Sequence, residues 1–234
     1  MTSLETTYAI AGCVEKKFVD CAPLRALLTD LHSAQSLKHP YTWESKYQNT
    51  LDLRPDAHSY DAVILGTLRI NNIPKLLDEL LGPDMVLTHT QIRCSRPGPS
   101  YMDWHRDTYI HTGLKPVGNF PPAHKLIYYP TLGRQPERKL KMIVGSHRRN
   151  FDSLSDDMNG CSGMPRKDYL SSDDSFVIFN TSMLHGVIPD SHQDGSIRII
   201  YSFLRRHQYE RSLSDINVHK EQVELYENEV LKCV

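Results

Sequence analysis

The stretch Trp104-His105-Arg106-Asp107 is the most informative part of this chain. His105 and Asp107 are two residues apart, so on an extended strand both side chains point to the same face. At the end of a strand, with a slight turn, both side chains can reach one metal ion. A further histidine, His185, stands far downstream and directly follows the apolar run 176–179 and a short turn. The sequence therefore predicts that two strand ends distant in the chain lie side by side.

Two histidines and one carboxylate on one face of a metal leave coordination positions open, which is the ligand set of non-haem Fe(II) oxygenases. The chain has 12 histidines, and a histidine taken alone is more often a hydrogen-bonded or solvated side chain than a ligand. The combination of ligand types and their order therefore carries the hypothesis. His192 and His111 are competing third ligands, whereas His147 belongs to a separate Gly-Ser-His turn.

Arg198 lies in the β-like run Ser196–Ser202, and a guanidinium in such an apolar strand is unusual. Burying it without a partner is expensive, and the carboxylate of a ligand would satisfy it with two hydrogen bonds. Ser202 shares the strand face of Arg198 and can add a hydroxyl group. The alternative is an edge strand that leaves Arg198 in solvent or in a structural pair with an aspartate.

Short runs bounded by Gly, Pro, Asn, Asp or Ser predict five strands. They are Met85–Cys94, Lys125–Tyr129, Leu140–Val144, Ser175–Phe179 and Ser196–Leu204. The first alternates strictly, which predicts one face of Val86, Thr88, Thr90 and Ile92 and an opposite, more polar face of Leu87, His89, Gln91 and Arg93. The polar face is suited to line a cavity.

Helical spacing of leucines predicts a helix over 22–37. A second helix is expected to start at Asn72 with Pro74 just inside it and to stop at Gly82-Pro83. Its expected buried face is Leu76, Leu77, Leu80 and Leu81. The polar segment 151–174 is expected to be a long loop, and 213–233 a helical tail.

Together these elements predict a mainly β protein, with a double-sheet jelly-roll core and flanking N-terminal and C-terminal helices. We expect a single domain over 1–234, with a helical part over about 1–83, the jelly roll over about 84–207 and the tail over about 208–234.

The composition excludes several classes of protein. With 27 basic and 28 acidic residues, the formal net charge is −1, so no global field attracts nucleic acid or acidic membranes. The sequence contains no apolar run of about 18 residues, as a membrane span requires, and we expect no signal peptide. Its five cysteines are scattered and form no Cys-x-x-Cys pair, which favours reduced thiols and a cytoplasmic location.

The order of these motifs resembles the phytanoyl-CoA dioxygenase-like group of Fe(II)/2-oxoglutarate-dependent oxygenases. The resemblance rests on His105-x-Asp107, then Val144-Gly145-Ser146-His147 after a strand, then His185 with Arg198 downstream. It covers roughly residues 85–206, about half of the chain.

The resemblance implies a double-stranded β-helix with iron held by His105, Asp107 and His185. It implies that Arg198 holds the distal carboxylate of 2-oxoglutarate, and that O2 takes an open position on the metal. The reaction would release succinate and CO2 and hydroxylate a C–H bond. Further cosubstrate contacts are expected from Gln91, with Arg93 as the substitute, and from Lys125, Tyr129 and Ser202.

The chain departs from the group in the segment before the Gly-Ser-His turn. Many members carry an acidic stretch with Asn-Gly there, whereas this chain has the basic segment 134–139, and Val144 stands where proline is usual. This difference puts the usual substrates of the group in question. Because Asp107 is present, halogenation, in which that carboxylate is lost, is not expected.

A small-molecule or amino-acid-like substrate is the expected partner, with nucleic acid and protein substrates left open. Two interpretations are equally good for the aromatic and polar residues around the metal motif: they form a pocket wall, or they pack in the core and rim of the jelly roll. These residues are Tyr101, Trp104, Tyr109, His111 and 113–122. Six basic residues cluster in the sequence, and a solvated charged face is the favoured interpretation over an anion-binding surface. They are Arg134, Arg138, Lys139, Lys141, Arg148 and Arg149. The rival functions are a cupin-like protein with another metal or without 2-oxoglutarate, a non-catalytic binding module, and an RNA-binding protein.

Overall fold

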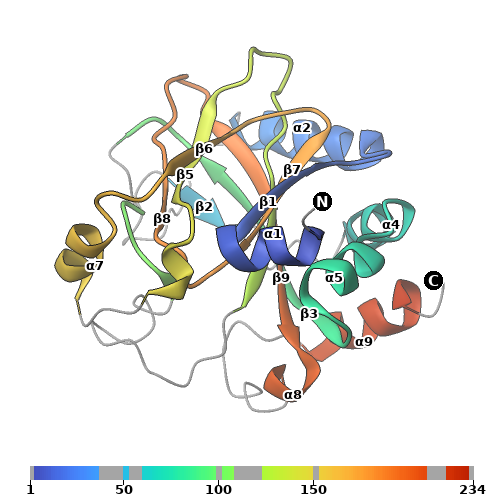
Figure 1. Ribbon diagram of the computed structural model, residues 1–234. Coiled ribbons are helices and arrows are strands. Elements are labelled where there is room, and N and C mark those ends of the chain that lie inside the picture. Colours follow the sequence, from blue (N-terminus) through green and yellow to red (C-terminus); the bar gives the residue numbers. More distant parts are fainter. Residues whose placement is uncertain are drawn as a thin grey trace.

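Two antiparallel β-sheets face each other in the computed structural model, which describes residues 3–36, 50–52, 60–98, 102–107, 123–149, 153–209 and 220–231 (Figure 1). The larger sheet has the strand order β1-β7-β4-β9-β3-β2, and the smaller has the order β6-β5-β8. The strands are β1 Cys13–Lys17, β2 Thr50–Asp52, β3 Met85–Ser95, β4 His124–Tyr128, β5 Arg138–Ile143, β6 Arg166–Leu170, β7 Ser175–Asn180, β8 His185–Val187 and β9 Ser196–Arg205. This arrangement confirms the predicted jelly roll.

Strand β9 shows why the larger sheet is buried on both faces. Ile197, Ile199, Tyr201 and Phe203 belong to the apolar core on the helical side of the sheet. Ile200 belongs to a second core between the two sheets, together with side chains from the smaller sheet. Since successive strand residues alternate between faces, Arg198 and Ser202 point into the space between the sheets with Ile200. The jelly-roll interior therefore combines apolar and charged side chains.

A β-bulge in β3 changes the predicted faces of that strand. The pairing with β9 shifts between Leu87 and His89, so Thr88 is an extra residue. Leu87 consequently lies in the helix-side core with Ile92, although strict alternation placed them on opposite faces. Beyond the bulge the prediction holds, because Gln91 pairs with Ile200 and shares its face.

The helices cover the outer face of the larger sheet and fill the helix-side core (Figure 1). They are α1 Leu4–Ala11, α2 Ala22–Ser36, α4 Asp61–Ile70, α5 Ile73–Leu81, α8 Arg206–Tyr209 and α9 Lys220–Glu229. Helix α2 confirms the first predicted helix, and α9 confirms the tail where it is described. No helix in the described ranges is long and apolar enough to span a membrane.

Helix α5 starts and stops where the sequence predicts, with Asn72 and Gly82 as its caps. Asn72 makes no side-chain capping bond and instead adopts a left-handed backbone conformation, with φ of 49°. Leu77 and Leu80 are buried, together with Ile73 and Pro74 at the first turn. Leu76 and Leu81 are only partly buried, so two of the four predicted leucines lie at the edge of the buried face.

Two expectations about chain organisation are wrong. The N-terminal part is not purely helical, because β1 and β2 extend the larger sheet at both edges. The segment 151–174 is not one long loop, because it contains helix α7 Leu154–Gly160 and strand β6. Helix α7 is capped by the Ser153 side chain, which accepts from the Asp156 amide, and its buried residue is Asp157. An apolar pattern cannot reveal a helix whose buried side chain is a carboxylate.

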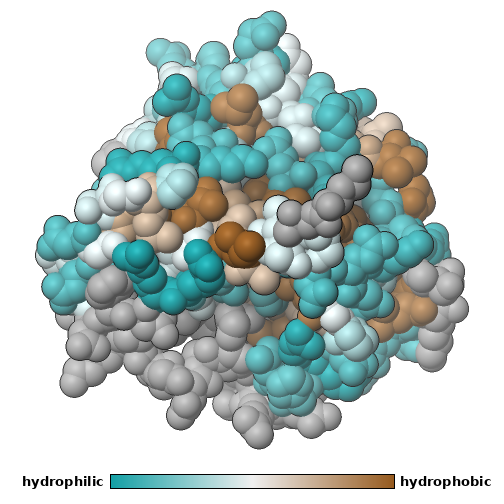
Figure 2. Space-filling model, viewed as in Figure 1, coloured by the Kyte–Doolittle hydropathy of each residue, from teal (hydrophilic) through white to brown (hydrophobic). Residues whose placement is uncertain are grey.

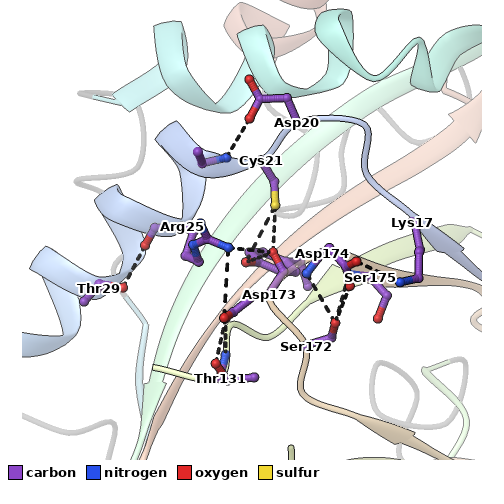
Figure 3. Close-up of polar contacts among 12 residues, drawn as sticks. Lys17, Asp20, Cys21, Arg25, Thr29, Thr131, Ser172, Asp173, Asp174 and Ser175 are labelled. Atoms are coloured by element: carbon purple, nitrogen blue, oxygen red, sulfur yellow. Dashed lines mark hydrogen bonds and ion pairs between the residues drawn. The ribbon is translucent and has the colours of Figure 1, made fainter. Parts of the chain in front are cut away.

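Helix α2 is tied to one end of the larger sheet through Asp173 (Figure 3). The Asp173 carboxylate accepts from the Thr131 hydroxyl at 2.7 Å, and its carbonyl accepts from Cys21 at 2.9 Å and Arg25 at 3.3 Å. Thr131 follows β4, and Asp173 precedes β7. The helix is therefore held to the end of these strands, while the start of β4 and the end of β7 remain at the opposite end of the sheet.

The face of the molecule seen in Figure 2 is mostly hydrophilic, and its apolar side chains gather in small, separate patches. The largest exposed apolar fractions among the described residues are 87% for Val19, 53% for Ile70 and 50% for Ile10. Scattered apolar residues of this kind are ordinary on a folded surface.

Candidate metal centre

The backbone pairs His105 with His185. The His105 amide donates to the His185 carbonyl at 2.9 Å, and the His185 amide donates to the His105 carbonyl at 3.0 Å. The Asp107 amide donates to the Thr181 carbonyl at 3.2 Å, just beyond the end of β7. The His-x-Asp segment therefore runs along the turn between β7 and β8. His185 is the first residue of strand β8.

Three ligand atoms converge at this junction. Asp107 Oδ1 lies 3.7 Å from His105 Nε2 and 3.7 Å from His185 Nε2, and the three ligand atoms lie within 4.8 Å of one another. Two donors that are each about 2.1 Å from one ion cannot be more than about 4.2 Å apart. The measured separations to Asp107 fit within that limit.

The histidine tautomers suit metal binding. His105 Nδ1 lies 2.6 Å from the Asp103 carbonyl, and His185 Nδ1 lies 2.8 Å from the Met183 carbonyl. Because a carbonyl only accepts, each Nδ1 carries a proton, so Nε2 is the nitrogen of each ring that can bind a metal. His105 Nε2 is buried and has no hydrogen-bond partner within the described structure. A metal ion would satisfy this buried atom, so the residues present fit a bound metal.

Burial and neighbouring charges keep His185 and Asp107 in the protonation states that a metal requires. Burial, followed by the nearby His105, lowers the pKa of His185 to about 3. Burial by itself raises the pKa of Asp107, but the Lys125 charge and the two histidines hold it well below its usual value. At neutral pH the junction therefore contains a neutral imidazole at His185 and a carboxylate at Asp107.

Arg106, between the two ligands, points the other way and binds helix α7. Its Nε and a terminal nitrogen each donate to the Asp157 carboxylate at 2.7 Å. Its other terminal nitrogen donates to the Ser182 carbonyl, in the turn that leads to His185. Arg106 is 2% exposed and Asp157 is fully buried. We refer to these three residues as the Arg106 clamp; the sequence interpretation assigned it no role.

The Gly-Ser-His turn supports the residue next to His185. The Ser146 hydroxyl donates to the Ile143 carbonyl at 2.7 Å and accepts from the Leu184 amide at 2.9 Å. The Ile143 amide in turn donates to the Leu184 carbonyl at 2.9 Å. His147 bonds the Ala9 carbonyl at 3.0 Å and lies outside the ligand cluster.

The other predicted site residues line the interior along three neighbouring strands. Arg198 is 2% exposed, donates to the Ser95 hydroxyl at 2.9 Å, and lies 5.6 Å from the centre of the Tyr129 ring. Gln91 and Ser202 are also buried. On β9 the four-residue step from Arg198 to Ser202 spans about 13 Å along the strand.

Lys125 lies at the metal end of this interior row. It pairs with Ser202 on β9 and Phe179 on β7. Its ammonium donates to Asp107 Oδ2 at 2.8 Å. Tyr129 and Arg198 lie at the end nearer to helix α2, so the predicted cosubstrate residues divide between the two ends of the interior.

Of the two competing histidines, only His192 is described, and it lies outside the ligand cluster. His192 Nε2 lies 2.5 Å from Glu137 Oε1, and His111 is outside the described residues. Of the expected pocket wall, Trp104 lies beside the Lys141 ammonium and the Arg166 guanidinium, at 4.7 and 5.6 Å from its ring. The rest of that wall, namely Tyr101, Tyr109 and 113–122, is also outside the described residues.

The basic group from the sequence is largely neutralised. Lys139 is buried between Glu137 and Asp190, each at 2.6 Å, and Arg138 lies 3.5 Å from Asp168. Arg134 pairs with Asp194, Lys141 with Asp103, and Arg149 with the Gly160 carbonyl. This pairing weakens the case for a nucleic-acid surface, but the expected solvated face is wrong at Lys139, which is only 4% exposed.

Several solved structures with this fold are described as alpha-ketoglutarate-dependent enzymes or were crystallised with 2-oxoglutarate. The non-heme alpha ketoglutarate dependent epimerase SnoN from nogalamycin biosynthesis has a TM-score of 0.63 at 14% identity, over 86% of this chain and 82% of that chain. HygX from Streptomyces hygroscopicus, solved with nickel and 2-oxoglutarate, has a TM-score of 0.59 at 13% identity, over 85% of each chain.

EctD from S. alaskensis, solved with 2-oxoglutarate and 5-hydroxyectoine, has a TM-score of 0.56 at 14% identity, over 86% of this chain and 75% of that chain. No protein-family model matches the chain, and a search of curated proteins found no match. The phytanoyl-CoA dioxygenase-like group is not singled out among these neighbours. The chain has the jelly-roll fold of these non-haem alpha-ketoglutarate-dependent enzymes.

Proposed function

We propose that this protein is an Fe(II)- and 2-oxoglutarate-dependent dioxygenase that hydroxylates a C–H bond of a small molecule. One observation carries the proposal: the Nε2 atoms of two histidines and one carboxylate oxygen converge at one end of an interior that holds a buried arginine farther along. This combination provides a metal site with open positions and a cationic group for a bound carboxylate.

In this proposal, His105, Asp107 and His185 hold the iron. With O2 and 2-oxoglutarate the iron supplies the oxidising chemistry, and succinate and CO2 are released. The fold neighbours support this choice of cofactors, because SnoN was solved with Fe3+ and alpha ketoglutarate and HygX with nickel and 2-oxoglutarate.

Arg198 binds the distal carboxylate of 2-oxoglutarate. Its guanidinium is held by Ser95 and lies beside the Tyr129 ring, so it is already oriented before the ligand arrives. A carboxylate accepts two parallel hydrogen bonds from such a group. Gln91 and Ser202 add polar groups between Arg198 and the metal end.

Apolar side chains around this row exclude water from the reaction. Ile127, Ile200, Val177 and Phe179 are buried in the core between the sheets. Water excluded from the site cannot compete for the open metal positions, and the low polarity strengthens the contact between Arg198 and a carboxylate.

The proposed substrate is a small molecule. The neighbours support this class, since SnoN was solved with nogalamycin RO and EctD with 5-hydroxyectoine. The neighbours catalyse diverse reactions, since one is described as an epimerase and another as a carbocyclase. Hydroxylation is therefore tested separately from the cofactors. A cytoplasmic location is proposed from the free thiols of Cys13, Cys21, Cys94 and Cys161.

The test of the cofactors is anaerobic. Adding Fe(II) and then 2-oxoglutarate to the protein should produce the weak visible charge-transfer band of the iron-bound keto acid. His105→Ala and Asp107→Ala should each lose the band and the release of succinate. His192→Ala is the matched control, because this histidine pairs with Glu137 away from the cluster, and it should behave like the wild type. A folded wild-type protein without the band would overturn the proposal.

The test of the reaction follows from a screen of succinate release over amino acids, peptides, acyl thioesters and nucleosides. For a compound that stimulates release, the product formed under 18O2 should carry one labelled oxygen atom. A product of unchanged oxygen content, such as an epimer or a new ring, would overturn hydroxylation and leave the cofactors in place.

A further inference from the structure

We infer that Lys125 is a positioning residue that restricts Asp107 to coordination through a single oxygen. The inference rests on the proposed metal site and assigns Lys125 a role different from the cosubstrate contact expected from the sequence.

Asp107 Oδ1 faces the histidines, and Oδ2 faces the lysine. Oδ1 is 3.7 Å from Nε2 of both His105 and His185, whereas Oδ2 accepts from the Lys125 ammonium at 2.8 Å. Each carboxylate oxygen therefore has its own partners. An ammonium group donates hydrogen bonds and cannot accept one or bind a cation, so it occupies Oδ2 without competing as a ligand.

The surroundings make this contact stronger than a surface ion pair. The side chains of Lys125 and Asp107 are 21% and 14% exposed. Lys125 is held on β4, at the centre of the sheet, with Ser202 and Phe179 opposite it on the two neighbouring strands. A charge-assisted hydrogen bond in such a partly desolvated place is short and directional. The orientation of Asp107 is thus determined by the strand that carries Lys125.

The division matters because a carboxylate can bind an ion through one or both oxygens. With Oδ2 held by Lys125, Asp107 contributes one donor atom. A second donor from Asp107 would take a position that the keto acid or O2 needs, because the reactivity of a site with two histidines and one carboxylate depends on its open positions. Lys125 thereby keeps this coordination position open for the keto acid or O2.

This role differs from a direct contact between Lys125 and 2-oxoglutarate in one measurable respect. A direct contact affects only the protein with the cosubstrate bound. A positioning role changes the metal environment before any cosubstrate is added. The Co(II) form separates the two, because the intensity of its visible absorption bands reports the number of coordinated atoms.

The experiment compares wild-type protein with Lys125→Met, Lys125→Arg and Lys139→Met, each loaded with Co(II). Lys139→Met is the matched control, because Lys139 is also a buried strand lysine held by carboxylates, and it lies outside the ligand cluster. Circular dichroism checks that each variant is folded. If Lys125→Met is unfolded, Lys125→Gln gives the same comparison with a neutral side chain that reaches less far.

Without 2-oxoglutarate, Lys125→Met should show weaker visible bands than the wild type, as expected for an added oxygen donor, and should bind Co(II) at least as tightly. Its dissociation constant for 2-oxoglutarate should rise about tenfold or more. Lys125→Arg should restore the wild-type spectrum, and Lys139→Met should keep it.

A Lys125→Met spectrum identical to that of the wild type would overturn the positioning role, and weakened 2-oxoglutarate binding with that spectrum would assign Lys125 to direct cosubstrate contact. Wild-type protein that binds no Co(II) would instead overturn the metal site and the proposed function. The two failures are therefore distinguishable.

Discussion

Breaking the Arg106 clamp by Asp157→Asn should destabilise the protein and weaken metal binding together. The substitution keeps the shape of the side chain but removes the charge that faces a guanidinium only 2% exposed. Arg106 would then keep a buried charge without its carboxylate. Removing one partner of a buried ion pair costs about 3–5 kcal/mol. The full range applies because both groups are shielded from solvent.

For a domain of this size, 1 kcal/mol corresponds to a change in melting temperature of about 2–4 °C. We therefore expect Asp157→Asn to lower the melting temperature of the metal-free protein by roughly 6–20 °C. Because the clamp also binds the Ser182 carbonyl ahead of His185, its loss should also loosen the ligand arrangement. Weakening of Co(II) binding by about 10- to 100-fold is the expected range for a residue that supports metal ligands.

Urea unfolding of the metal-free protein gives the free energy, and calorimetric titration with Co(II) gives the affinity. Asp168→Asn is the control, because its pair with Arg138 is 3.5 Å long and largely exposed, and should cost at most about 1 kcal/mol. A cost below about 1 kcal/mol for Asp157→Asn, together with unchanged Co(II) affinity, would refute the reasoning. The double variant Arg106→Met/Asp157→Leu should recover much of the lost stability and little of the metal affinity.

Three further predictions follow from single contacts. Ser146→Ala should cost about 1–3 kcal/mol in urea unfolding, because it leaves the buried Leu184 amide without its acceptor; a neutral effect would exclude a supporting role for the turn. Arg198→Gln should raise the dissociation constant of 2-oxoglutarate on the order of a hundredfold by calorimetry, whereas the exposed Arg138→Gln should not, and equal effects would remove Arg198 from the cosubstrate site. Burial, followed by the charges of Arg205 and His147, lowers the pKa of His124 to about 3, so between about pH 3 and 6.5 the unfolded chain binds a proton that the folded chain does not. The free energy of unfolding of the metal-free protein should therefore decrease as the pH is lowered from about 6.5 to 3, by up to about 1.4 kcal/mol per pH unit from His124. His124→Gln should reduce this slope, and an unchanged slope would contradict the assignment.

The strands around the site could be predicted because their signals are local. The apolar run 176–179 and the largely apolar run of β9 each lie between turn residues, and the observed strands start and end within a residue or two of the predicted ones. Helix α1 and strand β1 were missed, although Ser3 and Gly12 cap the helix as local signals would suggest. These elements are short, and their stability comes from packing against the sheet, so their own sequences carry little weight.

The bulge at Thr88 depends on pairing with a strand more than a hundred residues away. Nothing in the alternation of β3 marks it, because both faces of the strand are buried and both carry apolar side chains. A one-residue change of register moves every later side chain to the other face. Only the assembled sheet therefore shows on which of its faces the Leu87 side chain lies.

The sequence by itself determined the chemistry that is available: two histidines, an aspartate and a strand arginine, in an order and spacing typical of a jelly roll with a metal site. Tertiary structure decided how these groups are held. It placed Lys125 on the second oxygen of Asp107, Arg106 on the buried Asp157, and Ser146 beneath the residue next to His185. Such contacts join segments far apart in the chain, and the pattern of any one segment reflects only its own period and turns. The His105-x-Asp107 motif therefore predicts a metal site, while the folded protein determines which oxygen of Asp107 faces the two histidines.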